Sequence, residues 1–153
     1  MNHTILKTVI YDQHELIRNF QIVPRDYEFE ESGNYVLVGL RRAGKSTLLY
    51  KLVLDLIAGG ADWEQIIYVN FEDERLSEFT AADFNDLLSV QSEMSDKKGY
   101  FFLDEVQNID GWEKFARRMA DAKEHIYITG SNARMLSREI ETTLGGRFFS
   151  KKV

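Results

Sequence analysis

One stretch of sequence decides the fold, Tyr35-Val36-Leu37-Val38-Gly39-Leu40-Arg41-Arg42-Ala43-Gly44-Lys45-Ser46-Thr47. It opens with a near-continuous apolar run, which is typical of a strand covered on both faces. It continues as G-x-x-x-x-G-K-[ST] and enters Lys45–Ala58, where apolar residues recur at helical spacing. In this order the glycines let backbone N–H groups surround phosphates, and the helix N-terminus adds a positive dipole end. The stretch therefore predicts a phosphate-binding loop.

The side chains of this loop have separate predicted roles. We expect Lys45 to reach the β- and γ-phosphates of a nucleotide, Ser46 to ligate Mg²⁺ and Thr47 to lie near the α-phosphate. Arg41 and Arg42 either add charge beside the phosphates or are solvated, and the sequence leaves both interpretations open. The predicted nucleotide-binding residues are Gly39, Leu40, Arg41, Arg42, Ala43, Gly44, Lys45, Ser46 and Thr47.

Strand and helix patterns alternate along the rest of the chain. The predicted strands are 35–40, 66–71, 100–103 and 125–129, with a fifth strand opening at Arg147. The predicted helices are 9–20, 45–58, 80–91, 110–121 and 133–141, two of them capped by Thr80 with Asp83 and by Asp110 with Glu113. This alternation predicts one α/β domain, a three-layer αβα arrangement with a mostly parallel sheet of about five strands. We expect residues 1–33 to form an N-terminal helix and lead-in segment, and residues 34–153 to form the core.

An acidic pair follows the apolar run Tyr100–Leu103. A phosphate-binding loop needs a carboxylate to hold Mg²⁺ and a group to activate the attacking molecule. We expect Asp104 to ligate Mg²⁺ or its water, and Glu105 to orient and partly deprotonate a hydrolytic water. Because Glu105 directly follows Asp104, the pair favours hydrolysis over phosphoryl transfer to an organic acceptor.

Composition excludes several classes of site. The 153 residues include no cysteine and three histidines far apart, so thiolate chemistry is excluded and a multi-histidine metal centre is not expected. The formal net charge of −6 argues against a broadly basic nucleic-acid-binding surface. No apolar run approaches the roughly 20 residues that span a bilayer, and no signal-peptide pattern opens the chain. We expect a cytoplasmic protein with no membrane partner.

These motifs resemble those of the P-loop ATPases of the AAA+ superfamily. More narrowly, the chain is similar to the prokaryotic AAA-type ATPase domain that commonly precedes a separate C-terminal domain. The residues that carry the resemblance are Gly39–Thr47, Tyr68–Leu76, Phe102–Gln107, Ile128–Asn132 and Leu144–Arg147. The resemblance implies that Lys45 and Ser46 belong to the Walker A motif, and Asp104 and Glu105 to the Walker B motif.

The same resemblance implies further roles at the ends of the last two strands. Ser131 is our first choice for the sensor 1 polar residue that contacts the γ-phosphate or the attacking water, and Asn132 is the alternative. Either residue could instead only cap the next helix. Arg147 is either an arginine finger presented to a neighbouring subunit of a homo-oligomer or a surface arginine.

Three other features follow from the comparison with the superfamily. Residues 22–24 stand where related ATPases contact the base. Asp73, in the acidic stretch Glu72-Asp73-Glu74, either positions water, metal or a loop, or caps a solvated turn. The helical lid that usually follows the fifth strand is not present, so we interpret the chain as a core cut from a larger protein. The C-terminal domain is then missing in cis, and weak activity is expected.

We therefore expect Mg²⁺-dependent binding and hydrolysis of ATP to ADP, coupled to a conformational change. A nucleotide-binding switch or interaction module with little turnover is the alternative, and a P-loop kinase is a weaker third interpretation. GTP specificity is disfavoured because no Asn-Lys-x-Asp motif is present. A nucleic-acid partner rests on family analogy alone, and the net charge does not support it.

Overall fold

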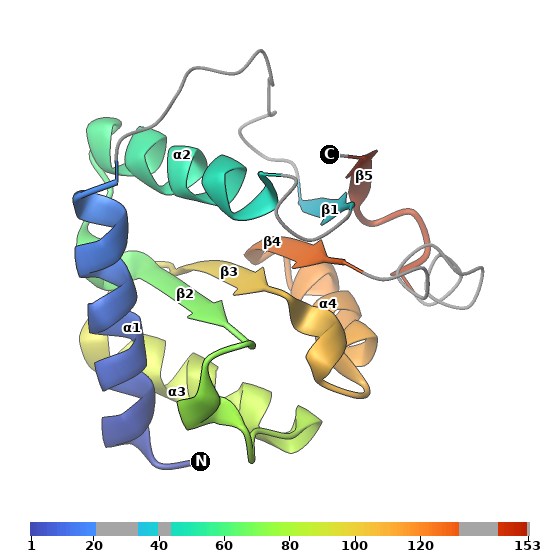
Figure 1. The fold of residues 1–153 in the computed structure, drawn as a ribbon, viewed down its shortest axis with the longest axis horizontal. Coiled ribbons are helices and arrows are strands. Elements are labelled where there is room, and N and C mark those ends of the chain that lie inside the picture. The colour runs from blue at the N-terminus through green and yellow to red at the C-terminus, as the bar shows by residue number, and fades with distance from the viewer. Residues whose placement is uncertain (21–33, 40–43, 132–143, 153) are drawn as a thin grey trace.

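The computed structural model describes residues 1–20, 34–39, 44–131 and 144–152 (Figure 1). Two sequence predictions lie outside these residues, namely the helix over 133–141 and the base-contacting role of residues 22–24. None of the helices in the described part of the chain has the length and apolar character needed to cross a membrane.

A five-stranded sheet forms the middle of the domain, with strand order β2-β3-β4-β1-β5. Every neighbouring pair runs parallel. The strands are β1 (Tyr35–Val38), β2 (Ile66–Asn70), β3 (Tyr100–Asp104), β4 (His125–Gly130) and β5 (Phe149–Lys152). The mostly parallel sheet predicted from the alternating pattern is confirmed, and β5 begins two residues after Arg147.

Helices cover both faces of the sheet, which confirms the three-layer arrangement (Figure 1). The α-helices are α1 (His3–Arg18), α2 (Lys45–Ala58), α3 (Phe84–Met94) and α4 (Trp112–Asp121). The side chains of α2 bury Tyr68 and Phe102 on one face of the sheet. Those of α3 and α4 bury Val69 and Leu103, the alternate residues of the same strands, on the other face. Strands covered on both sides explain why their sequences are almost continuously apolar.

Helix α1 crosses the sheet edge beside strand β2, from the α3 layer to the α2 layer, and contacts α2 and α3 as well (Figure 1). Its residues Leu6 and Ile10 enter the core on the α3 side, whereas Ile17 enters the core on the α2 side. His14 is 3% exposed, and its Nε2 lies 2.6 Å from the Ile66 carbonyl oxygen, so Nε2–H donates to this edge-strand acceptor. Burial lowers the pKa of His14. The helix therefore hydrogen-bonds the strand edge that it covers.

Three helices begin at residues other than the predicted ones, because different residues cap them. Helix α1 begins at His3 because the Asn2 side chain accepts from two backbone N–H groups of its first turn. The Thr80–Asp83 capping box is present, but it opens a short 3-10 turn before α3. The prediction that Asp110 caps α4 is wrong, because Gly111 is the cap, with φ 86°. Glycine adopts this left-handed conformation without steric cost, which a side chain at that position would incur.

Candidate nucleotide-binding site

Five of the predicted site residues meet at the carboxyl edge of the parallel sheet, where ligands bind in open α/β folds, namely Lys45, Ser46, Asp104, Glu105 and Ser131. Gly44, with φ 93°, precedes α2, so Lys45 and Ser46 are the first two residues of that helix. Asp104 ends β3, and Glu105 follows it directly. Because β1, β3 and β4 are neighbours in the sheet, the start of α2 faces the ends of β3 and β4.

Asp104 is fully buried and accepts three hydroxyl hydrogen bonds. Its Oδ2 accepts from Ser46 Oγ at 2.7 Å and from Tyr68 Oη at 2.5 Å. Its Oδ1 accepts from Thr129 Oγ1 at 2.5 Å. Burial, followed by the charge of Asp104, raises the pKa of Tyr68 well above its usual value, so Tyr68 remains a hydrogen-bond donor. The carboxylate is thus held from β2, β4 and α2 at once.

Glu105 adopts a left-handed backbone conformation, with φ 55° and ψ 48°. Such a conformation costs a side-chain-bearing residue roughly 1–2 kcal/mol and is often found at functional sites. The Glu105 N–H donates to Thr129 Oγ1 at 2.8 Å, and the Glu105 carbonyl accepts from Asn108 Nδ2 at 3.1 Å. The neighbouring side chains therefore hold the peptide groups on both sides of the strained residue.

The Glu105 carboxylate lies among polar groups of the same edge. Its two oxygens lie 2.6 and 2.5 Å from Ser131 Oγ, and Oε2 accepts from Gln107 Nε2 at 2.7 Å. Gln107 Oε1 in turn accepts from the Ser131 N–H at 3.3 Å. Of the two sensor 1 alternatives, Ser131 therefore contacts the acid expected to orient water, and Asn132 lies outside the described residues.

Lys45 joins the loop to the acidic pair. Its side chain is only 3% exposed, and Nζ donates to the Gly39 carbonyl at 3.0 Å. Nζ also lies 3.8 Å from Glu105 Oε1. A buried ammonium group is stable only with partners that offset its lost hydration. The Gly39 carbonyl and the Glu105 carboxylate are thus among the polar partners that hold Lys45 at this edge.

Ser46 and Asp104 provide oxygen atoms suited to a hard divalent cation. Ser46 donates its only hydroxyl hydrogen to Asp104 and keeps two lone pairs, while about four acceptor positions of Asp104 receive three hydrogen bonds. No group of three or more His, Cys, Asp or Glu side chains in the described residues could hold a metal ion. Mg²⁺ commonly binds through one or two protein oxygens together with water and substrate phosphates, and these residues fit that pattern.

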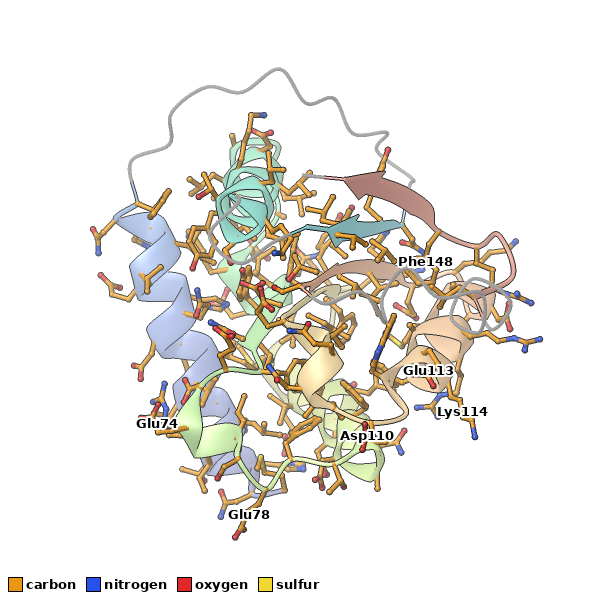
Figure 2. The ribbon with its side chains drawn as sticks, turned by 45° about the vertical axis from the view of Figure 1, so that its right-hand side comes forward. Glu74, Glu78, Asp110, Glu113, Lys114 and Phe148 are labelled. Carbon is orange, nitrogen blue, oxygen red and sulfur yellow. The ribbon has the colours of Figure 1, made fainter. Side chains whose placement is uncertain are left out.

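Two residues with predicted roles, Arg147 and Asp73, interact with residues outside the network around Asp104 and Glu105. Arg147 Nε donates to Asp121 Oδ1 at 2.5 Å, at the end of α4, and Nη1 donates to the Leu144 carbonyl. Asp73 caps a 3-10 turn by accepting from the Arg75 N–H at 3.0 Å, which confirms the capping interpretation. In Figure 2, Glu74 of the same acidic stretch projects from this turn at the surface of the domain.

Part of the phosphate-binding loop lies outside the described residues, namely Leu40, Arg41, Arg42 and Ala43. Gly39 and Gly44 flank this part, and the Gly39 N–H donates to the Gly130 carbonyl at 3.3 Å. Thr47 is half-buried in the first turn of α2.

Sequence reasoning missed Tyr68, Thr129 and Gln107. A polar group in an apolar strand is the available signal for the first two, since Tyr68 interrupts a run of isoleucine and valine and Thr129 directly follows Ile126-Tyr127-Ile128. The strand register then shows which of these side chains share a face of the sheet with Asp104. Tyr68 pairs with Phe102 of β3, and Asp104, two residues further, has its side chain on the same face. Gln107 carries no comparable signal, because its position depends on the turn after Glu105.

Comparisons with known proteins agree with this arrangement. Residues 31–153 match a family model described as an AAA domain. An uncharacterized protein of Methanocaldococcus jannaschii is 37% identical over 145 residues, covering 94% of this chain and 32% of that protein. An uncharacterized protein of Haemophilus influenzae is 39% identical over 120 residues, covering 77% of this chain and 30% of that protein. The chain spans about a third of the length of these relatives.

Proposed function

The chain belongs to the AAA domain family, and on this premise we propose that it binds ATP with Mg²⁺ and hydrolyses the ATP to ADP. Membership identifies an ATPase-like nucleotide-binding domain, and the proposal adds the reaction and its residues. The observation that carries it is the buried network at the carboxyl edge, in which Lys45, Ser46, Asp104 and Glu105 come together. We further propose that hydrolysis drives a conformational change.

Phosphate binding is the task of the loop and of the start of α2. The N–H groups around Gly44 and the positive end of the α2 dipole favour an anion at this place. Lys45 supplies a full positive charge beside them. Its present partners include the Gly39 carbonyl and the Glu105 carboxylate, and a phosphate offers the same ammonium group a stronger acceptor.

Ser46 and Asp104 would hold Mg²⁺ or its water ligands. The ion neutralises phosphate charge when it is bound. Asp104 is held in one orientation because three hydroxyls donate to it. The Ser46 hydroxyl donates its hydrogen bond to Asp104, so the lone pairs of Ser46 Oγ point away from the carboxylate.

Glu105 would orient the attacking water and accept its proton, and Ser131 would help to place both. Ser131 Oγ already contacts the Glu105 carboxylate, which supports its assignment to sensor 1. Arg147 is proposed to act between subunits of a homo-oligomer, and this role requires it to leave Asp121.

Substitution of Glu105 tests the proposal most directly. Glu105→Gln keeps the shape of the side chain but removes the base, so nucleotide binding should persist while phosphate release stops. Lys45→Ala should lose nucleotide binding itself. Phosphate release from ATP by the full-length protein and by both variants measures the difference. Equal release by wild-type protein and Lys45→Ala would contradict the proposal.

A second function has one observation in its favour. Both oxygens of Glu105 are engaged by Ser131 and Gln107, so the proposed base must change partners before it can accept a proton. A switch that holds ATP or ADP with little turnover is consistent with this arrangement. Nucleotide retained through purification, with near-zero phosphate release at high protein concentration, would favour the switch over the hydrolase. A P-loop kinase remains the third proposal, weakened by the carboxylate directly after Asp104.

The curated relatives are about three times as long as this chain. The activity, target and partners of the whole protein, a C-terminal domain in cis and a cytoplasmic location are therefore proposals from the sequence.

A further inference from the structure

We propose that Tyr68 is a positioning residue for Asp104, and that Tyr50 and Gln13 extend this support from the metal-binding acid to helix α1. The assignment rests on the proposed function, because Asp104 has this task only if the site binds a metal and a nucleotide. It adds to that function a dependence of metal binding on residues outside the phosphate-binding motifs.

Tyr68 controls the orientation of one carboxylate oxygen. The torsion that rotates a carboxylate is broad and roughly two-fold, so hydrogen bonds must select its orientation. Tyr68 Oη donates to Asp104 Oδ2 at 2.5 Å, the same oxygen to which Ser46 donates at 2.7 Å. Tyr68 is itself fully buried, with its ring stacked on Phe102 at 5.9 Å between centroids. A rigid aromatic side chain on β2 thus fixes the oxygen that faces Ser46.

Tyr50, on α2, links Tyr68 to the N-terminal helix. The rings of Tyr50 and Tyr68 pack at 5.4 Å between centroids. The Tyr50 hydroxyl accepts from Gln13 Nε2 of α1 at 3.2 Å. Phe20, just after α1, packs its ring edge against Tyr50 at 5.0 Å. These contacts place a side chain of α1 at one end of a continuous series that ends at Asp104.

The series crosses the boundary of the family match. Residues 31–153 match the AAA domain model, so Gln13 and Phe20 lie outside it, whereas Tyr50, Tyr68 and Asp104 lie inside. Besides its packing against the core, helix α1 therefore contacts a tyrosine that packs against the support of Asp104. Displacement of α1 would remove the Gln13 and Phe20 contacts from Tyr50 and loosen the support of the carboxylate.

Loss of groups that orient metal ligands typically weakens metal affinity by roughly 10–100-fold. We therefore expect Tyr68→Phe to raise the Mg²⁺ concentration needed for half-maximal binding of a fluorescent ADP analogue by about 10-fold or more. Binding of the same analogue in EDTA should stay unchanged, because Tyr68 donates its hydrogen bond to Asp104, the acid proposed to act through the metal. ADP is chosen so that turnover does not affect the measurement.

Tyr127→Phe is the matched control. Tyr127 is buried on the same face of the sheet and stacks on the other side of Phe102 at 4.8 Å, but Asp104 receives its hydrogen bonds from other residues. This variant should have the wild-type Mg²⁺ requirement. Gln13→Ala, at a half-buried position of α1, should shift the requirement in the same direction as Tyr68→Phe but by less.

The possible results distinguish a failure of the proposed function from a failure of the role assigned to Tyr68. If the full-length wild-type protein shows no Mg²⁺-dependent binding of the analogue, the proposed function fails and the assignment fails with it. If wild-type protein binds and Tyr68→Phe has the same Mg²⁺ requirement as Tyr127→Phe, only the assignment of Tyr68 is wrong. If Tyr68→Phe unfolds, an unchanged Mg²⁺ requirement in Gln13→Ala overturns the connection to α1.

Discussion

Replacement of Thr129 by valine removes one hydroxyl that serves both acids of the site. Thr129 is fully buried, donates to Asp104 Oδ1 at 2.5 Å and accepts from the Glu105 N–H at 2.8 Å. A hydrogen bond to a charged group contributes about 1.5–3 kcal/mol, and a buried N–H left without a partner costs about 1–3 kcal/mol. Thr129→Val should therefore lower the free energy of unfolding by about 2.5–6 kcal/mol, a large part of the 5–15 kcal/mol typical of a domain.

Urea unfolding followed by tryptophan fluorescence measures this loss, and two variants control it. Thr129→Ser keeps the hydroxyl and removes a methyl group, so it should be about 1 kcal/mol less stable than wild type. Thr8→Val removes an exposed hydroxyl that donates to the Thr4 carbonyl within α1, and should change stability by less than about 0.5 kcal/mol. If Thr129→Val is no less stable than Thr129→Ser, the hydroxyl does not hold the two acids as described.

Two further predictions concern the fold. Burial lowers the pKa of both His14 and His125 below the ordinary 6.5, so the unfolded chain binds protons first, and stability should fall as the pH drops through 6.5. Urea midpoints that stay constant between about pH 7.5 and pH 5 would contradict this. Gly111→Ala, at φ 86°, should cost about 1–2 kcal/mol, whereas Gly59→Ala, at φ −81°, should be neutral or stabilising by about 0.4–1 kcal/mol. Thermal unfolding of both variants provides the comparison.

Local patterns predicted the parts of the fold that depend on local chemistry. The start and end of α2 follow directly from Gly44 before it and Gly59 after it, and the predicted limits are correct. The cap of α4 was assigned to Asp110 because aspartate is a preferred cap. The actual entry into the helix requires a left-handed residue, and that requirement comes from how the chain turns after β3.

In the site, too, the residues of local motifs could be predicted and those that depend on strand pairing could not. Lys45, Ser46, Asp104 and Glu105 could be predicted because their chemistry requires fixed positions within a strand–loop–helix and at a strand end. The partners of Asp104 could not, because the hydroxyls of Tyr68 and Thr129 reach it from two other strands. Their identification requires the pairing of β2, β3 and β4, which the order of strands along the chain does not reveal.

The cover that α1 provides over β2 makes the two edges of the sheet unequal. At β2, the His14 side chain already occupies the Ile66 carbonyl, and the helix fills the space that another strand would need. At the opposite edge the described residues end with β5, which pairs only with β1. A further strand therefore cannot pair with the sheet at β2 without displacing α1 and the His14 hydrogen bond.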